Sequence, residues 1–97
     1  MAEIAWTDEA QRWLADIYDF IAADNPVAAA QTAQGIFERA QVLKTHSEIG
    51  HRYLPSSRNV RILLYGHYRI AYLVREDGNI DILGVFHGSL DISRYQI

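Results

Sequence analysis

The chain has 97 residues, 49% of them hydrophobic, which is typical of one folded domain and excludes disorder as the main state. It has no cysteine, so disulfides and thiolate metal sites are excluded and a reducing, cytoplasmic environment is expected. No apolar run approaches the ~18 residues of a membrane span, and the net charge of −3 argues against a general nucleic-acid binder, so we expect no membrane association and no direct specific DNA binding.

The charges are distributed unevenly along the chain. Residues 1–38 hold seven acids and one base, residues 39–75 hold seven bases and one acid, and residues 76–97 hold four acids and one base. The middle of the chain can therefore meet an acidic partner although the whole protein is acidic. The alternative is that acidic helices neutralise a basic sheet within one molecule.

The N-terminal part predicts a short strand and a helical hairpin. Ile4-Ala5-Trp6 is a β-type run, and Thr7 is a suitable N-cap for a helix over residues 8–23. Apolar residues recur there with the helical period, at positions 10, 13, 14, 17, 18 and 21. Asn25 and Pro26 are typical of the cap and first position of a second helix, whose apolar stripe reaches Leu43.

Beyond residue 50 the hydrophobic period changes to two. Strands are predicted to begin near Arg52–Leu54 and to span Val60–Tyr65, Tyr68–Val74 and Ile80–His87. Tight turns between them favour an antiparallel meander. The sequence therefore predicts a single α+β domain over residues 1–97, in which a short N-terminal strand and an α-helical hairpin pack on a C-terminal antiparallel sheet.

One face of this sheet is predicted to stay uncovered. In the last strand, Ile80, Ile82, Gly84 and Phe86 alternate with Asp81, Leu83, Val85 and His87. Two helices on one side cannot cover both faces, so we expect a partner to bind a half-apolar face that carries Leu73, Leu83 and Val85 between Arg69 and His87. The alternative is that the tail covers this face with Tyr95 and Ile97.

Five short motifs follow one another along the chain. They are Ile4-x-Trp6-Thr7-x-x-Ala10, Ile21-Ala22-x-Asp24-Asn25-Pro26-x-Ala28-Ala29, Ile49-Gly50-x-Arg52, Tyr68-Arg69-Ile70-Ala71-Tyr72 and Ile82-Leu83-x-Val85-x-His87-Gly88. No single motif is diagnostic, but in order and spacing they resemble the RelE/ParE superfamily of toxins from bacterial type II toxin–antitoxin modules. The resemblance covers nearly the whole chain and is closer to the ParE branch.

This resemblance implies a small toxin that is harmless while bound to a cognate antitoxin. In the family, a partly disordered antitoxin segment lies along the helices and the sheet edge, so the expected complex is hetero-oligomeric. ParE-like members inhibit DNA gyrase, which leads to DNA breaks and growth arrest. The resemblance therefore implies a binding inhibitor of gyrase that needs no cofactor.

The resemblance also implies two sets of contact residues. Those expected to bind the target lie on the central strand and in the C-terminal part: Arg69, His87, Gly88, Asp91, Arg94 and Tyr95. Those expected to bind the antitoxin lie on the sheet: Arg61, Leu63, Leu73, Leu83 and Val85. The ParE pattern usually has an arginine just before the aspartate that follows His-Gly, and this chain has Leu90 there.

Two alternative functions follow from the same resemblance. RelE-like members cleave mRNA on the ribosome. In this chain the residues that would carry out that chemistry are Arg61, Arg69, His87 and Tyr95, although a second basic cluster is missing. The alternative is that these residues have structural roles, such as an ion pair between Arg69 and Asp81 across the strands. The other alternative is a non-toxic relative that only binds its antitoxin. The four histidines have no metal-type spacing, so no metal site is expected.

Overall fold

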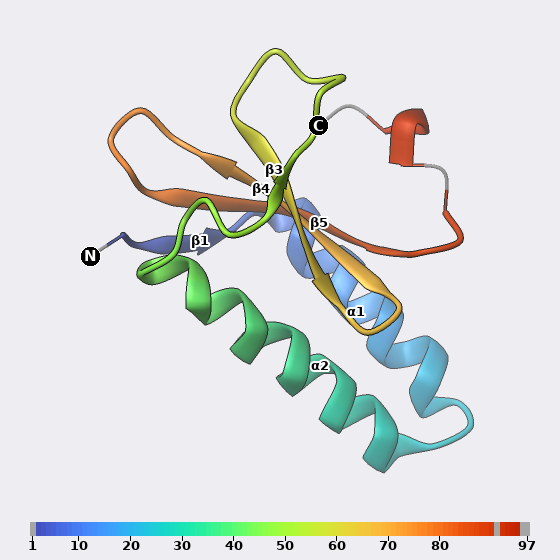
Figure 1. Cartoon of the computed structure of the whole chain (residues 1–97). Helices are drawn as coiled ribbons and strands as arrows, with labels where there is room; N and C mark the ends of the chain where they lie inside the picture. The colour runs from blue at the N-terminus through green and yellow to red at the C-terminus, as the bar shows by residue number, and fades with distance from the viewer. Residues whose placement is uncertain (1, 91, 96–97) are drawn as a thin grey trace.

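The computed structural model describes residues 2–90 and 92–95. A short strand and two helices precede four further strands, and two short 3-10 helices complete the fold (Figure 1). The elements are β1 (Ile4–Trp6), α1 (Asp8–Ala22), α2 (Pro26–Ala40), η1 (Gln41–Lys44), β2 (His51–Arg52), β3 (Val60–Tyr65), β4 (Tyr68–Val74), β5 (Ile80–His87) and η2 (Ile92–Arg94). The predicted α+β architecture is confirmed.

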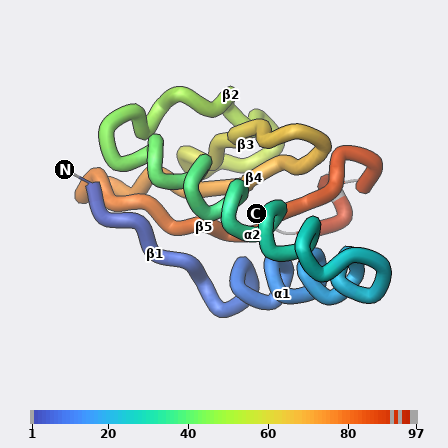
Figure 2. The backbone as a smooth tube through the Cα atoms, turned by 90° about the horizontal axis from the view of Figure 1, so that it is seen from below, coloured from blue at the N-terminus to red at the C-terminus, as the bar shows by residue number. Residues whose placement is uncertain are grey.

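Both helices begin where their capping residues predict. The Thr7 side chain accepts a hydrogen bond from the Ala10 N–H at 3.1 Å, and the Asn25 side chain accepts one from the Ala28 N–H at 3.1 Å. Pro26 occupies the first turn of α2, where its missing N–H leaves no bond unmade. The short connection makes α1 and α2 a hairpin, with α1 packed mainly against β5 and α2 against β3 (Figures 1 and 2).

The five strands form one sheet in the order β1-β5-β4-β3-β2. Strands β2 to β5 make the predicted antiparallel meander, whose tight turns place Gly66 and Gly78 at positive φ. Strand β1 adds to the outer side of β5 and runs parallel to it, with Ile4 opposite Ile80 and Trp6 opposite Ile82. The complete sheet is therefore mixed. None of the helices in the described part of the chain is long and apolar enough to cross a membrane.

A β-bulge in β5 corrects the predicted faces of that strand. Ala71 pairs with Gly84, but the next residue, Tyr72, pairs with Ile82, so Leu83 is an extra residue in β5. Beyond Leu83 the two faces exchange, and Val85 joins the residues that face the helices. Val85 is fully buried there. Its predicted place on an uncovered face is wrong because the strand does not alternate through the bulge.

The hydrophobic core lies on both sides of the sheet. The larger cluster, on the side of the helices, includes Leu63, Ile70 and Tyr72. Leu63 is 2% exposed, so it too is a core residue and not part of an uncovered face. A smaller cluster on the opposite side consists of Ile62, Ala71, Phe86 and Ile92, with Trp13, Tyr53 and Leu83 packed against it.

This smaller cluster overturns the prediction of a bare apolar sheet face. Ile92 in η2 and Tyr53 in the β2–β3 loop pack over the middle of that side of the sheet, and Phe86 beneath them is 1% exposed. Tyr95 also folds back, with ring centroids 5.3 Å from Phe86 and 5.2 Å from Trp13. The alternative in which the tail covers the sheet is thus supported for Tyr95. Ile97 lies outside the described residues.

Candidate functional site

The structure does not bring the four predicted catalytic residues together. Arg61 pairs with Tyr72 and His87 pairs with Tyr68, so both belong to the side of the sheet that carries the helices. Arg69 pairs with Phe86 and belongs to the opposite side, where Tyr95 packs on the same phenylalanine. Arg69 and His87 nevertheless meet at the end of the sheet, where both line a pocket of about 320 Å³ whose lining includes neither Arg61 nor Tyr95.

Arg61 is engaged by the loop that leads into β2. Its guanidinium donates to the carbonyl oxygens of Glu48 at 3.2 Å and Gly50 at 2.9 Å, and to the Asn59 side chain at 3.2 Å. The Glu48 carboxylate lies 3.8 Å away. These contacts account for Arg61 as a structural residue that fixes the loop.

Tyr72 holds the same loop from beneath. Its hydroxyl accepts a hydrogen bond from the Gly50 N–H at 3.0 Å and donates one to the Ser47 carbonyl at 2.8 Å. Burial raises the pKa of the Tyr72 hydroxyl, and the Gly50 N–H, which favours the phenolate, opposes this shift. The tyrosine is a structural group that sequence reasoning assigned only to a strand.

Arg69 holds the turn that follows β5. One guanidinium nitrogen donates to the carbonyl oxygen of Gly88 at 3.4 Å and also to that of Leu90. Nε is buried and has no partner among the described residues. The predicted pair with Asp81 is not formed, because Asp81 lies 3.7 Å from Arg75 instead. Arg69 therefore shapes the backbone of the predicted target-binding region.

His87 ends β5 on the exposed surface. Its Nδ1 accepts a hydrogen bond from the Ser89 N–H at 3.2 Å and lies 2.8 Å from the Ser89 hydroxyl, so the neutral ring carries its proton on Nε2. The ring stacks with His67 at a centroid distance of 6.2 Å and meets Tyr68 edge-on at 5.6 Å. His87 thus lies beside His67 and Tyr68, and the three side chains line a pocket of about 320 Å³.

The remaining predicted target residues lie around this turn. Gly88 is exposed and bonds through its N–H to the His67 carbonyl at 2.6 Å. Arg94 and Tyr95 are exposed in the short C-terminal segment. Asp91 lies outside the described residues.

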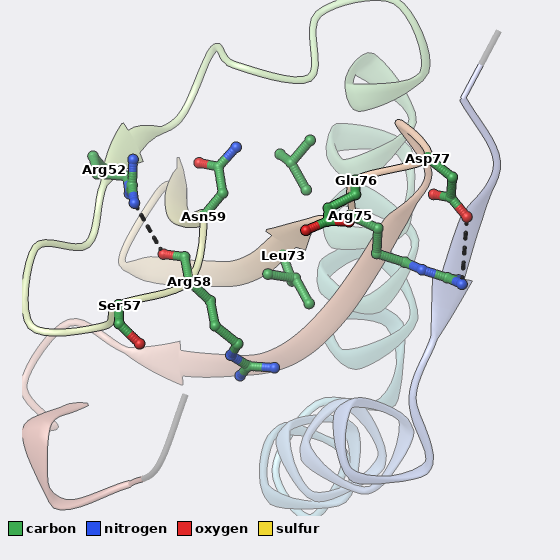
Figure 3. Close-up of a pocket in the computed structure, with 9 residues that line it drawn as sticks. Arg52, Ser57, Arg58, Asn59, Leu73, Arg75, Glu76 and Asp77 are labelled. Carbon is green, nitrogen blue, oxygen red and sulfur yellow. Dashed lines mark hydrogen bonds and ion pairs between the residues drawn. The ribbon is translucent and has the colours of Figure 1, made fainter.

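Of the predicted antitoxin residues, only Leu73 and Leu83 keep partly exposed apolar side chains on the side opposite the helices. Leu73 lies at the base of a groove of about 790 Å³ between the β2–β3 loop and the β4–β5 turn (Figure 3). The groove is lined by Arg52, Ser57, Arg58, Asn59, Leu73, Val74, Arg75, Glu76 and Asp77. It is predominantly polar at its rim and apolar at its base.

Sequence reasoning missed two apolar grooves on the helical hairpin. One, of about 470 Å³, lies between α1 and α2 and is lined by Trp6, Gln11, Leu14, Ala15, Tyr18, Ala33 and Phe37. The other, of about 540 Å³, lies between α1 and the end of β5 and includes Ile17, Phe20, Tyr68 and Leu90. Phe20 is 84% exposed. The available signal was Phe20 itself, an aromatic residue placed outside the apolar stripe of its helix.

No group of three or more histidine, cysteine, aspartate or glutamate side chains in residues 2–90 and 92–95 could hold a metal ion. The polar side chains described above bond to backbone carbonyls or to neighbouring loops.

Comparison with known proteins identifies a matching family, and solved structures that are similar to this chain. The family described as "ParE toxin of type II toxin-antitoxin system, parDE" matches residues 4–92. A solved structure described as "Chromosomal ParDE TA system from P. aeruginosa" is similar with a TM-score of 0.72 and 26% sequence identity, over 90% of this chain and 96% of that chain. No curated protein matches the chain.

Proposed function

The chain belongs to the ParE toxin family of type II toxin–antitoxin systems, and on that premise we propose that it inhibits DNA gyrase by binding and is neutralised by a cognate antitoxin. The observation that favours binding over catalysis is that Arg61 and Tyr95 lie apart from the pocket that Arg69 and His87 share, so the four side chains do not converge on one phosphate. Binding needs complementary surfaces and no convergent acid, base and cation.

The proposed antitoxin surface is the helical hairpin. The groove between α1 and α2 is almost wholly apolar at its lining, with Tyr18 39% and Phe37 44% exposed. The second groove adds the exposed ring of Phe20. Exposed contiguous apolar surface of this kind marks a protein-binding site, and a segment that folds on binding can cover both grooves. The complex would then be hetero-oligomeric.

Leu73 and Leu83 remain secondary candidates for antitoxin contact, because each is partly exposed. Leu63 and Val85 are not part of the proposed antitoxin surface, because a buried side chain offers no surface to a partner. Arg61 contributes indirectly, through the loop that it holds.

The proposed target surface is the end of β5 with the turn and tail that follow it. His87, Gly88, Arg94 and Tyr95 are exposed there, and Arg69 supports the turn from the sheet. Asp91 belongs to this proposal on sequence grounds alone. An aromatic, histidine and arginine surface suits a protein target, because these residues dominate binding energy at interfaces.

The test combines a cellular and a purified assay. Expression of the chain alone should arrest growth with induction of the DNA-damage response, and the purified chain should inhibit supercoiling by gyrase. Co-expression of the neighbouring antitoxin gene should restore growth. Rapid translation arrest with mRNA cuts in the ribosomal A site, without loss of supercoiling, would instead establish the endonuclease alternative, and no phenotype at good expression would establish the non-toxic one.

A further inference from the structure

The groove of Figure 3 contains two arginines whose charge is not paired by a carboxylate within the described chain. Among the described residues, Arg61 and Arg75 are the only cations that form ion pairs. Arg52 and Arg58 therefore have no carboxylate partner among these residues. Both arginines are exposed. They form the basic end of the groove.

The opposite end of the groove is acidic. Glu76 and Asp77 line it from the β4–β5 turn together with Arg75, which lies 3.4 Å from Asp77, so among these three side chains Glu76 keeps the unpaired charge. Leu73 forms the apolar base between the two ends, and Figure 3 shows its side chain between the Arg58 side and the Glu76 side. The groove therefore has a basic end, an apolar middle and an acidic end.

Both walls of the groove are held in place by hydrogen bonds. In the loop wall, the Arg58 carbonyl accepts from the Val60 N–H at 2.9 Å and from the Arg52 guanidinium at 3.2 Å. The wall is tied to β4 because the Val74 N–H donates to the Asn59 carbonyl at 3.0 Å. In the turn wall, the Arg75 N–H donates to the Asn79 carbonyl at 2.9 Å. A preformed groove loses little conformational entropy when a ligand binds.

We propose that this groove binds an extended peptide segment of a protein partner that carries acidic residues at one end and aliphatic residues at the other. Carboxylates of the segment pair with Arg52 and Arg58, where an arginine fork can bind a carboxylate through two hydrogen bonds. An aliphatic side chain of the segment packs on Leu73. This order places the carboxylates of the segment beside Arg52 and Arg58 and keeps them away from Glu76 at the other end of the groove.

A nucleic-acid strand fits the same groove less well. Its continuous phosphate charge would meet Glu76 and Asp77 at the acidic end, and the protein as a whole is negatively charged. The groove also lies on the sheet side away from α2, so it is separate from the apolar grooves of the helical hairpin. The inference therefore stands independently of the proposed neutralisation through the hairpin.

The test uses the full chain and a fluorescein-labelled peptide in which two glutamates are followed by two leucines. Fluorescence anisotropy should show binding that weakens as salt is raised. The double variant Arg52→Glu/Arg58→Glu should bind this peptide about tenfold less tightly and should gain affinity for a matched peptide in which lysines replace the glutamates. Arg12→Glu, a charge reversal at an exposed position of α1, is the matched control and should change neither affinity.

Three results would overturn the proposal. The first is equal loss of affinity in the Arg12→Glu control. The second is peptide-induced NMR shifts confined to residues around Phe20 and not around Arg58 and Leu73. The third is tighter binding of a single-stranded oligonucleotide that competes with the peptide, which would make the groove a nucleic-acid site. Melting curves of each variant confirm that the exposed substitutions leave the fold intact, and none of these readouts depends on gyrase inhibition.

Discussion

The guanidinium of Arg69 donates a hydrogen bond to the carbonyl of Leu90, the residue that stands where the ParE pattern usually has an arginine. The bond crosses from the central strand β4 to the turn after β5, and the same nitrogen also reaches the Gly88 carbonyl. The side chain at position 90 is apolar, yet its backbone is fixed by an arginine from elsewhere in the fold. Arg69 thus acts on the proposed target surface through the shape of this turn.

The substitution Arg69→Ala is expected to loosen the turn and tail. It removes charge-assisted hydrogen bonds to two carbonyls, and we expect a loss of about 1 kcal/mol in unfolding free energy, because the site is partly exposed. Hydrogen exchange should accelerate in residues 88–95. The control Arg12→Ala removes an exposed arginine from α1 and should leave this exchange unchanged. Unchanged exchange in Arg69→Ala with lost toxicity would instead mean that Arg69 contacts the target directly.

The substitution Gly50→Ala is expected to be the more damaging of two glycine changes. A Cβ at Gly50 would lie 2.7 Å from the Ile62 carbonyl oxygen and 2.8 Å from the Tyr72 ring, and the carbonyl belongs to the sheet and cannot move aside. We expect a loss of about 2–3 kcal/mol in unfolding free energy. At Gly66 the space is open but φ is +56°, so Gly66→Ala should cost only about 1 kcal/mol. Urea unfolding of both variants measures the difference, and equal losses would contradict the crowding at Gly50.

The substitution Tyr72→Phe is expected to weaken the loop that leads into β2. It leaves the Gly50 N–H and the Ser47 carbonyl without their partner, which costs about 1–3 kcal/mol if water does not replace the hydroxyl. Thermal unfolding gives the loss. A melting temperature equal to that of the parent chain would show that the hydroxyl does not stabilise the loop.

The same hydroxyl gives a pH dependence of stability in alkali. Burial raises the Tyr72 pKa above its ordinary value of 10.0, so the folded protein keeps this proton at a pH where the unfolded chain has released it. Unfolding then releases a proton, and the free energy of unfolding falls as pH rises above about 10, whereas below that pH the group contributes no slope. The comparison is urea unfolding from about pH 8 to pH 11, in which Tyr72→Phe should show a smaller fall than the parent chain. Parallel curves would contradict a raised pKa.

The elements could be predicted from the sequence because their determinants are local. Thr7 and Asn25 cap the helices through bonds to residues three positions away, and the apolar periods of the helices and strands lie within each segment. The tight turns at Gly66 and Gly78 are likewise set by their own residues. These features gave the correct order of helices and strands.

The sheet faces could not be predicted, because they depend on contacts far along the chain. The bulge at Leu83 is defined by the partners that β4 offers, and Gly84 beside it is a local signal that does not fix which residue is the extra one. Ile92 and Tyr53 cover the apolar side of the sheet from two loops that are distant in sequence. An apolar residue predicted on a strand face can therefore be buried by either side, whereas Phe20 and Phe37 are exposed on the hairpin.

The substitution Phe20→Ser tests whether that hairpin surface binds the antitoxin. The ring is 84% exposed, so its removal should change the unfolding free energy by no more than about 0.5 kcal/mol. It should weaken the purified toxin–antitoxin complex about tenfold, because a large apolar side chain beside a groove is the kind of residue that dominates an interface. Leu54→Ser is the matched control, since Leu54 is 82% exposed but lies in the β2–β3 loop, away from the hairpin. Titration calorimetry with the antitoxin encoded beside this chain should show weakened binding for Phe20→Ser alone, and the opposite pattern would place the antitoxin on the β2–β3 loop.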